Sequence, residues 1–160
     1  METLYVYNPD TGSFVQADEW LKDADPKRAQ LIGIKTDRGM LVLEKKDLGE
    51  HTFAKAQAVA EAHKVKGFDQ GFRCPTRRET IDIQDAIDAG LHDLMDAIGG
   101  DSLLGDWYWT SERFSEGRWF ARRYNATNAW FFYGASGYLS NGDVYSSFRC
   151  RAVTLLPTEG

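Results

Sequence analysis

The sequence of 160 residues predicts an α+β fold in a single domain, on the basis of three observations. The first 50 residues alternate apolar and polar side chains in short runs, which is typical of strands. The middle of the chain, from residue 52 to residue 98, carries helix start and stop signals. After Gly105 the chain is rich in aromatic and turn-forming residues and carries no helix signal.

The N-terminal part predicts two β-hairpins. Residues 4–8 and 13–16 flank a Pro-Asp-Thr-Gly turn and form the first pair. Residues 29–36 and 39–45 form the second pair. The connection from residue 20 to residue 26 is predicted to be irregular or briefly helical.

The middle of the chain predicts two helices. The first covers residues 52–66, which are rich in alanine and are followed by Gly67 as a stop signal. The second begins at Thr76, because Thr76 and Glu79 have the spacing of a capping box. It is predicted to run to about residue 89 and to break at Gly90, and residues 91–98 favour a further helical segment.

Most of the aromatic residues lie between residues 105 and 148, where they predict an aromatic-rich β meander. The strands are expected at residues 107–109, 118–124, 129–133 and 146–153, separated by Gly, Ser and Asn turns. For Trp107, Trp109 and Trp130 we favour burial in the core. The tyrosines and arginines of this region lie in polar surroundings, and Tyr and Arg are frequent in binding hot spots.

Charge and motifs exclude several classes of function. The formal net charge of −5 gives no reason to expect nucleic acid as a partner. No apolar run is long enough to span a membrane, so we expect no membrane insertion. No signal peptide is visible, which favours the cytoplasm or a phage or other assembly and leaves the compartment open.

No metal ion or cofactor is expected. His51, His63 and His92 lie in different elements and are interpreted as exposed side chains, and the two cysteines are far apart in the sequence. Three aspartates on the second helix, at positions 82, 85 and 88, are interpreted as a solvated helix face. Nucleotide-binding glycine motifs and a GxSxG nucleophile motif are absent from the sequence.

Four segments together resemble one bacterial family. Residues 56–83, AQAVAEAHKVKGFDQGFRCPTRRETIDI, resemble an alanine-rich helix followed by a W-R-L-P-T-x-x-E-L segment. DWYWTSE (106–112), NAWFF (128–132) and FRCRAV (148–153) resemble the Y-W-S-S-T-E, A-W and V-R-C-V-R strands that follow in that family. The family is the C-type-lectin-like domain found at the C-terminus of bacterial collagen-like adhesins. It is related in fold to formylglycine-generating enzymes and to phage receptor-binding proteins.

The resemblance implies a C-type-lectin-like fold, in which two helices pack on a twisted antiparallel sheet, and the role of a non-catalytic binding module. The expected ligand is a glycan or a protein surface. Calcium-dependent sugar binding is not expected, because the E-P-N, Q-P-D and W-N-D motifs are absent from the sequence. Two alternatives stay open: an enzyme of the formylglycine-generating type, and a structural domain of a homo-oligomeric assembly. Formylglycine formation requires a pair of cysteines in the closing region, where only Cys150 lies.

We expect the ligand surface between residues 110 and 145, with stacking by aromatic rings and polar contacts from arginine, Asn and Asp. Asn141 and Asp143 either contact the ligand or shape a turn at Asn141-Gly142. The predicted ligand-binding residues are Tyr108, Arg113, Arg118, Trp119, Arg122, Arg123, Tyr124, Tyr138, Asn141, Asp143 and Tyr145.

The only two cysteines lie in two copies of the tripeptide Phe-Arg-Cys, at residues 72–74 and 148–150. Cys74 stands where the family pattern has leucine, which indicates a small buried side chain. Family members often carry a cysteine in the first helix that could pair with the closing-strand cysteine, and here that position is Ala60. We favour two reduced thiols over a Cys74–Cys150 disulfide, and the sequence leaves both open.

Overall fold

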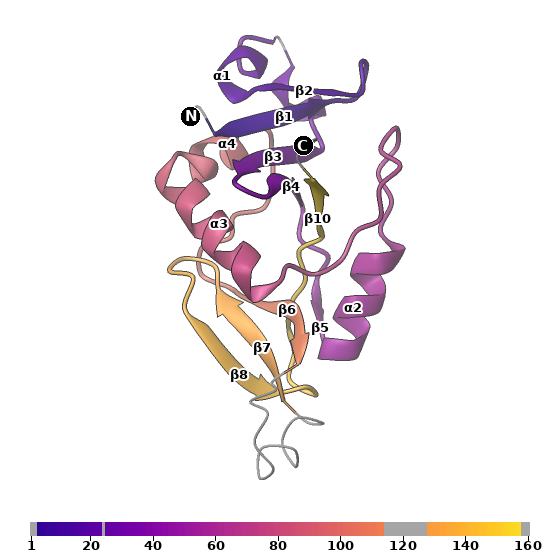
Figure 1. The fold of residues 1–160 in the computed structure, drawn as a ribbon, viewed down its shortest axis with the longest axis vertical. Coiled ribbons are helices and arrows are strands. Elements are labelled where there is room, and N and C mark those ends of the chain that lie inside the picture. Colours follow the sequence, from indigo (N-terminus) through magenta and orange to yellow (C-terminus); the bar gives the residue numbers. More distant parts are fainter. Residues whose placement is uncertain (1–2, 24, 114–127, 158–160) are drawn as a thin grey trace.

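The computed structural model describes residues 3–23, 25–113 and 128–157. Within these ranges the chain forms helices and two five-stranded sheets, which confirms the predicted α+β class. The two sheets lie one above the other in Figure 1, with α2 and α3 on opposite sides of the junction between them. The expectation of a single sheet is therefore wrong.

The first sheet, sheet A, contains the two predicted N-terminal hairpins and the last strand of the chain. All its neighbours pair antiparallel, in the order β10-β4-β3-β1-β2. Its strands are β1 (Leu4–Asn8), β2 (Ser13–Gln16), β3 (Leu31–Thr36), β4 (Gly39–Glu44) and β10 (Val153–Pro157).

The connection between β2 and β3 is briefly helical, as predicted: α1 spans Ala17–Trp20 and the 3₁₀ helix η1 spans Pro26–Arg28. The later helices are α2 (Phe53–Ala62), α3 (Arg77–Asp88) and α4 (Leu91–Ala97). The break at Gly90 is confirmed, since Gly90 has a φ of 109°.

Helix α2 is shorter than predicted and ends at Ala62 rather than at Lys66. The next residue, His63, has an extended backbone, and its Nε2 lies 2.7 Å from Glu44 Oε2. Beyond it, Val65 and Phe68 form an isolated β-bridge. These tertiary contacts end the helix before the chain reaches Gly67, which is the stop signal in the sequence.

The second sheet, sheet B, contains the aromatic meander. The strand order is β5-β9-β6-β7-β8, and all its pairs are antiparallel except β6 with β9. Its strands are β5 (Glu50–His51), β6 (Trp107–Arg113), β7 (Asn128–Tyr133), β8 (Leu139–Asp143) and β9 (Phe148–Arg149).

The segment 146–153, predicted as one strand, is divided between the two sheets. Phe148 and Arg149 pair with β5 in sheet B, whereas Val153 onward pairs with β4 in sheet A. The three residues between them are fully buried. The backbone of Cys150 bonds to Leu48 and Gly49, so the chain passes from one sheet to the other through the interior.

Three apolar clusters hold these elements together. The largest joins one face of sheet A to α3, α4 and the inward-facing Tyr108 and Phe132 of sheet B. A second covers the opposite face of sheet A with Phe68 and Phe72. A third packs α2 against Trp109 and both cysteines. Sheet B is thus covered by helices on both faces only near its centre.

Candidate functional site

The aromatic side chains of sheet B form a continuous stripe on one face. Side chains alternate along a strand, so Trp107 and Trp109 of β6 share a face, as do Phe131 and Tyr133 of β7. Phe148 of β9 joins them. We call these five residues the aromatic stripe. The distances between ring centroids along it are 4.8 Å for Trp109–Phe148, 4.4 Å for Phe131–Phe148, 5.1 Å for Trp107–Phe131 and 4.8 Å for Trp107–Tyr133.

One end of the aromatic stripe is buried under α2. Trp109 is fully buried, and its Nε1 donates a hydrogen bond of 2.8 Å to the His51 carbonyl. Its ring meets Phe53 of α2 edge to face at 5.4 Å. This end therefore has a single fixed geometry, which orients the rings that follow it.

The other end of the stripe reaches the surface, where Tyr138 extends it by one further ring. We call Trp107, Tyr133 and Tyr138 the open end of the stripe. Trp107 stacks on Tyr133 with an angle of 18° between the ring planes, and both are half-buried. Tyr138 follows in the β7–β8 turn, with its ring edge toward Trp107 at 6.4 Å. It is 63% exposed.

The turn that carries Tyr138 is held by backbone contacts. The amide of Tyr133 donates to the Tyr138 carbonyl at 2.9 Å, and the amide of Gly137 donates to the Tyr133 carbonyl at 2.7 Å. A side chain at Gly134 would overlap the backbone of Leu103, so this glycine allows the turn to pack against the loop before β6. The open end is consequently presented on a fixed scaffold.

The opposite end of sheet B carries four further predicted binding residues, Arg113 at the end of β6 and the others in β8 and the turn after it. Arg113 is exposed and lies over the Phe53 ring, with 5.0 Å from its guanidinium carbon to the ring centroid. Asn141 accepts a hydrogen bond of 2.9 Å from Asn128. Tyr145 is 77% exposed in the turn after β8. Asp143 accepts from the Tyr145 amide at 2.7 Å and so shapes that turn.

The turn predicted at Asn141-Gly142 does not exist, because both residues lie within β8 and pair with β7. Gly142 instead leaves room for a ring from the neighbouring strand, since a Cβ there would lie 2.8 Å from Phe131 Cε1. Residues 144–146 form the turn.

Tyr138 and Tyr145 lie at opposite ends of β8 and do not form one small site. Tyr138 and Val144 flank the five residues of β8, so at about 3.3 Å per residue the two turns lie roughly 20 Å apart. A monosaccharide reaches one end only, and an extended glycan or a protein surface reaches both.

The structure corrects one predicted binding residue. Tyr108 is fully buried, its ring is stacked on Phe132, and its hydroxyl donates to the Ser102 carbonyl at 3.3 Å. It faces α3 and α4 rather than solvent, because it alternates with Trp107 along β6. Five other predicted binding residues lie outside the described residues: Arg118, Trp119, Arg122, Arg123 and Tyr124.

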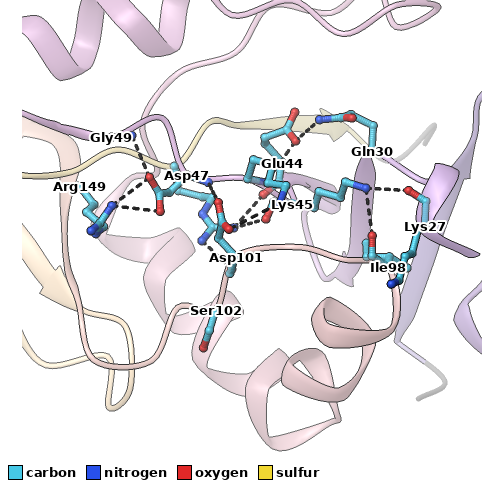
Figure 2. A network of polar contacts seen from close by, with 12 residues as sticks. Lys27, Gln30, Glu44, Lys45, Asp47, Gly49, Ile98, Asp101, Ser102 and Arg149 are labelled. Carbon is cyan, nitrogen blue, oxygen red and sulfur yellow. Dashed lines mark hydrogen bonds and ion pairs between the residues drawn. The ribbon is translucent and has the colours of Figure 1, made fainter.

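A network of polar contacts joins the end of β4 to the loop after α4 (Figure 2). Lys45 Nζ donates to the carbonyls of Lys27 and Ile98 at 2.8 Å and 2.9 Å. Ile98 caps the C-terminus of α4, where a cation is favoured. Burial of the ammonium group lowers the pKa of Lys45. No pattern in the sequence indicates that this lysine is buried.

Arg151 completes the network from the closing segment. Its guanidinium is fully buried and donates to the carbonyls of Glu44, Lys45 and Asp101 at 3.2 Å, 2.8 Å and 2.8 Å. Nearby, Arg149 donates to Asp47 at 3.2 Å. These contacts connect the two sheets, so the network is structural.

A pocket of about 540 Å³ lies between the β1–β2 turn, η1 and the segment after α2. Arg28, Lys64 and Lys66 line it, and Arg28 is paired with Asp10 at 2.7 Å. Serine, threonine and cysteine are not among its lining residues.

His63 and Glu44 lie beside this pocket, and their contact corrects the interpretation of His63 as an exposed side chain. Glu44 is fully buried and also accepts from Gln30. These contacts hold the segment after α2 against sheet A, so the pair has a structural role.

Comparison with known proteins leaves the family open. The chain matches no protein-family model, and a search of curated proteins gives no match either. Over the described ranges, no group of three or more His, Cys, Asp and Glu side chains is arranged to hold a metal ion. No helix in the same part of the chain is both long and apolar enough to cross a membrane.

Sequence reasoning missed Trp107 and Tyr133 as surface residues. The signal available was their alternation with the more apolar positions of β6 and β7, which places them on the face opposite Tyr108 and Phe132. Their exposure depends on where α2 stops covering that face, which is a tertiary property.

Proposed function

We propose that the chain is a non-catalytic binding module that recognises a glycan or a protein surface through the open end of the aromatic stripe. The observation that carries the proposal is the geometry of Trp107, Tyr133 and Tyr138, whose rings continue from a fixed core to the surface. Tyr and Trp bury a large area on binding at a small cost in conformational entropy. Half-exposed rings on a rigid sheet are suited to this role.

The residues at the other end of sheet B, from the end of β6 and from β8 and its following turn, form a second contact for an extended ligand. Arg113, Asn141 and Tyr145 combine a cation, an amide and an exposed ring there. A ligand that occupies both ends spans roughly 20 Å along β8, which is within the reach of an oligosaccharide or a protein loop.

The proposed fold is the C-type-lectin-like one. Its support is the sequence resemblance together with the closing strand β10, which pairs with β4 in the N-terminal sheet. Helices α2 and α3 flank the junction of the two sheets (Figure 1).

An enzyme of the formylglycine-generating type is less well supported. Such chemistry requires an accessible, readily ionised thiol. Both cysteines are fully buried, so neither thiol is accessible in the folded chain.

Glycan and surface-protein arrays probed with the purified chain test the proposal. We expect Tyr138→Ala to weaken binding at least tenfold, because it removes the most exposed ring of the open end. Ile81→Ala is the matched control, since Ile81 on α3 is 50% exposed and lies outside the aromatic stripe. Equal binding by both variants, or binding by neither variant nor wild type, would contradict the proposal.

Size exclusion tests the remaining alternative, a structural role in a homo-oligomer. If the exposed rings serve self-association, the wild type elutes as an oligomer and Tyr138→Ala elutes as a monomer. The proposed function requires instead that both elute alike.

A further inference from the structure

The only two cysteines of the chain, 76 residues apart in sequence, meet in the core. Their Sγ atoms lie 3.8 Å apart, and both side chains are fully buried. Both are free thiols in this structure. Each Sγ also lies near the Ala56 carbonyl of α2, at 3.7 Å for Cys74 and 3.4 Å for Cys150.

The backbone on both sides of the pair is fixed. Next to Cys74, Arg73 exchanges two backbone hydrogen bonds with Val153, at 2.9 Å and 2.8 Å. Cys150 donates to the Gly49 carbonyl at 3.1 Å and accepts from the Leu48 amide at 2.7 Å. A disulfide has a sulfur–sulfur distance of about 2.05 Å, so the sulfur atoms need to approach by about 1.8 Å. Because the flanking backbone is held, disulfide formation requires that rotation about the Cα–Cβ bonds of the two cysteines supplies this movement.

We propose that Cys74 and Cys150 are an oxidative modification site, which closes into an intrachain disulfide on reaction with a low-molecular-weight disulfide such as oxidised glutathione. One cysteine, as thiolate, attacks the glutathione disulfide and releases one glutathione thiolate. The other cysteine then attacks the resulting mixed disulfide and releases the second. The protein loses two electrons and two protons, and one oxidised glutathione becomes two reduced glutathione molecules.

Access to the pair is controlled by α2. The thiols lie beneath this helix, in the cluster that includes Phe53, Ala56 and Ala60. A glutathione molecule reaches them only when α2 moves away, so oxidation of the folded chain is slow and proceeds at the rate of this local opening. Conditions that loosen α2 accelerate it.

The disulfide would tie the segment before α3 to the segment that closes the chain. It encloses a loop of 76 residues, which restricts the unfolded chain far more than the folded one. The modification therefore stabilises the fold, and it is independent of whether the open end of the stripe binds a ligand.

Redox titration of the reduced protein tests the inference. Samples are equilibrated at a series of ratios of oxidised to reduced glutathione, quenched with acid, alkylated in denaturant and weighed as intact chains. We expect loss of both alkylation sites in the same monomer. The folded chain should oxidise at ratios on the order of a thousandfold more reducing than the same chain in urea.

Thermal unfolding supplies the second readout. Oxidation should raise the Tm of the wild type by several degrees, roughly 5 °C or more. Cys74→Ala and Cys150→Ala are the controls, and oxidation should leave the Tm of each unchanged. The proposal would be overturned if folded and unfolded chains oxidise at the same ratio of oxidised to reduced glutathione. It would also be overturned if disulfides form only between chains, or if oxidation lowers the Tm.

Discussion

The buried ion pair of Glu79 with Arg73 gives the sharpest prediction on stability. Glu79 is 1% exposed and starts α3 through the capping box with Thr76. Its carboxylate accepts from the Arg73 guanidinium at 2.5 Å and 2.7 Å and from the Thr76 amide at 2.9 Å. Replacing Glu79 by Gln removes the charge and one acceptor oxygen while keeping the size.

The contacts of Glu79 set the expected loss in the free energy of unfolding. Glutamine retains one oxygen, so at least one of the three charge-assisted hydrogen bonds is lost, and its amide group faces a guanidinium that also donates. Hydrogen bonds to charged groups are worth about 1.5 to 3 kcal/mol each. The Arg73 side chain is 35% exposed, so water replaces part of the hydrogen bonding that Arg73 loses with the Glu79 carboxylate. We therefore expect Glu79→Gln to lower the free energy of unfolding by about 2 to 4 kcal/mol.

Urea unfolding at pH 7 measures this change, and Glu19→Gln is the matched control. Glu19 makes the same kind of contact with Lys22, at 3.1 Å, but the two side chains are 64% and 73% exposed. Its replacement should change the free energy by less than about 0.5 kcal/mol. If Glu79→Gln is no more destabilising than Glu19→Gln, the assignment of Glu79 as a buried anchor of α3 is wrong.

The same pair predicts a pH dependence. Burial raises the pKa of Glu79, but the hydrogen bonds from Arg73 and Thr76 outweigh it, so the pKa lies below the ordinary value of 4.5. The folded chain then holds fewer protons at this site than the unfolded chain. The contribution is complete above pH 4.5 and is lost as the pH falls through the folded-state pKa. The stability difference between wild type and Glu79→Gln should shrink in that window, as pH-dependent urea unfolding would reveal.

Two further changes test the packing of sheet A. Gly39→Ala should destabilise the fold by about 3 kcal/mol in urea unfolding, since Gly39 has a φ of 136° and a Cβ would overlap the Leu156 carbonyl. Gly12→Ala, at a φ of 74° where a Cβ would meet only Tyr7 Oη at an ordinary contact distance of 3.6 Å, should cost only about 1 kcal/mol, and equal costs for the two variants would contradict this expectation. Lys45→Met should cost about 2 kcal/mol because it removes the donor from the carbonyl oxygens of Lys27 and Ile98, the second of which lies in a buried contact. Thermal unfolding measures this change, and an unaltered Tm would show that the ammonium contacts contribute nothing.

The elements that the sequence predicts well are those specified by local signals. The capping box of Thr76 and Glu79 is confirmed, as are the break at Gly90 and the N-terminal hairpins. Each depends on residues within a few positions of one another, so one short window contains the whole cause.

The features that it predicts poorly depend on distant partners. Arg151 is buried because carbonyl groups from residues 44, 45 and 101 accept hydrogen bonds from its guanidinium, and no local sequence pattern indicates this burial. Tyr108 and Trp107 are adjacent aromatic residues, but Tyr108 is fully buried and Trp107 is only half-buried. The difference arises because α3 and α4 cover one face of β6 and α2 covers only part of the other. Alternation predicts that they face opposite ways, and only the tertiary packing decides which one is exposed.

Chemical-shift mapping with an isotopically labelled chain shows which residues contact the ligand. With a ligand identified on the arrays, we expect amide and indole shifts to change first at Trp107, Tyr133 and Tyr138. An extended ligand should add changes at Tyr145. Shifts confined to the pocket lined by Arg28, Lys64 and Lys66 would place the ligand elsewhere and contradict the account.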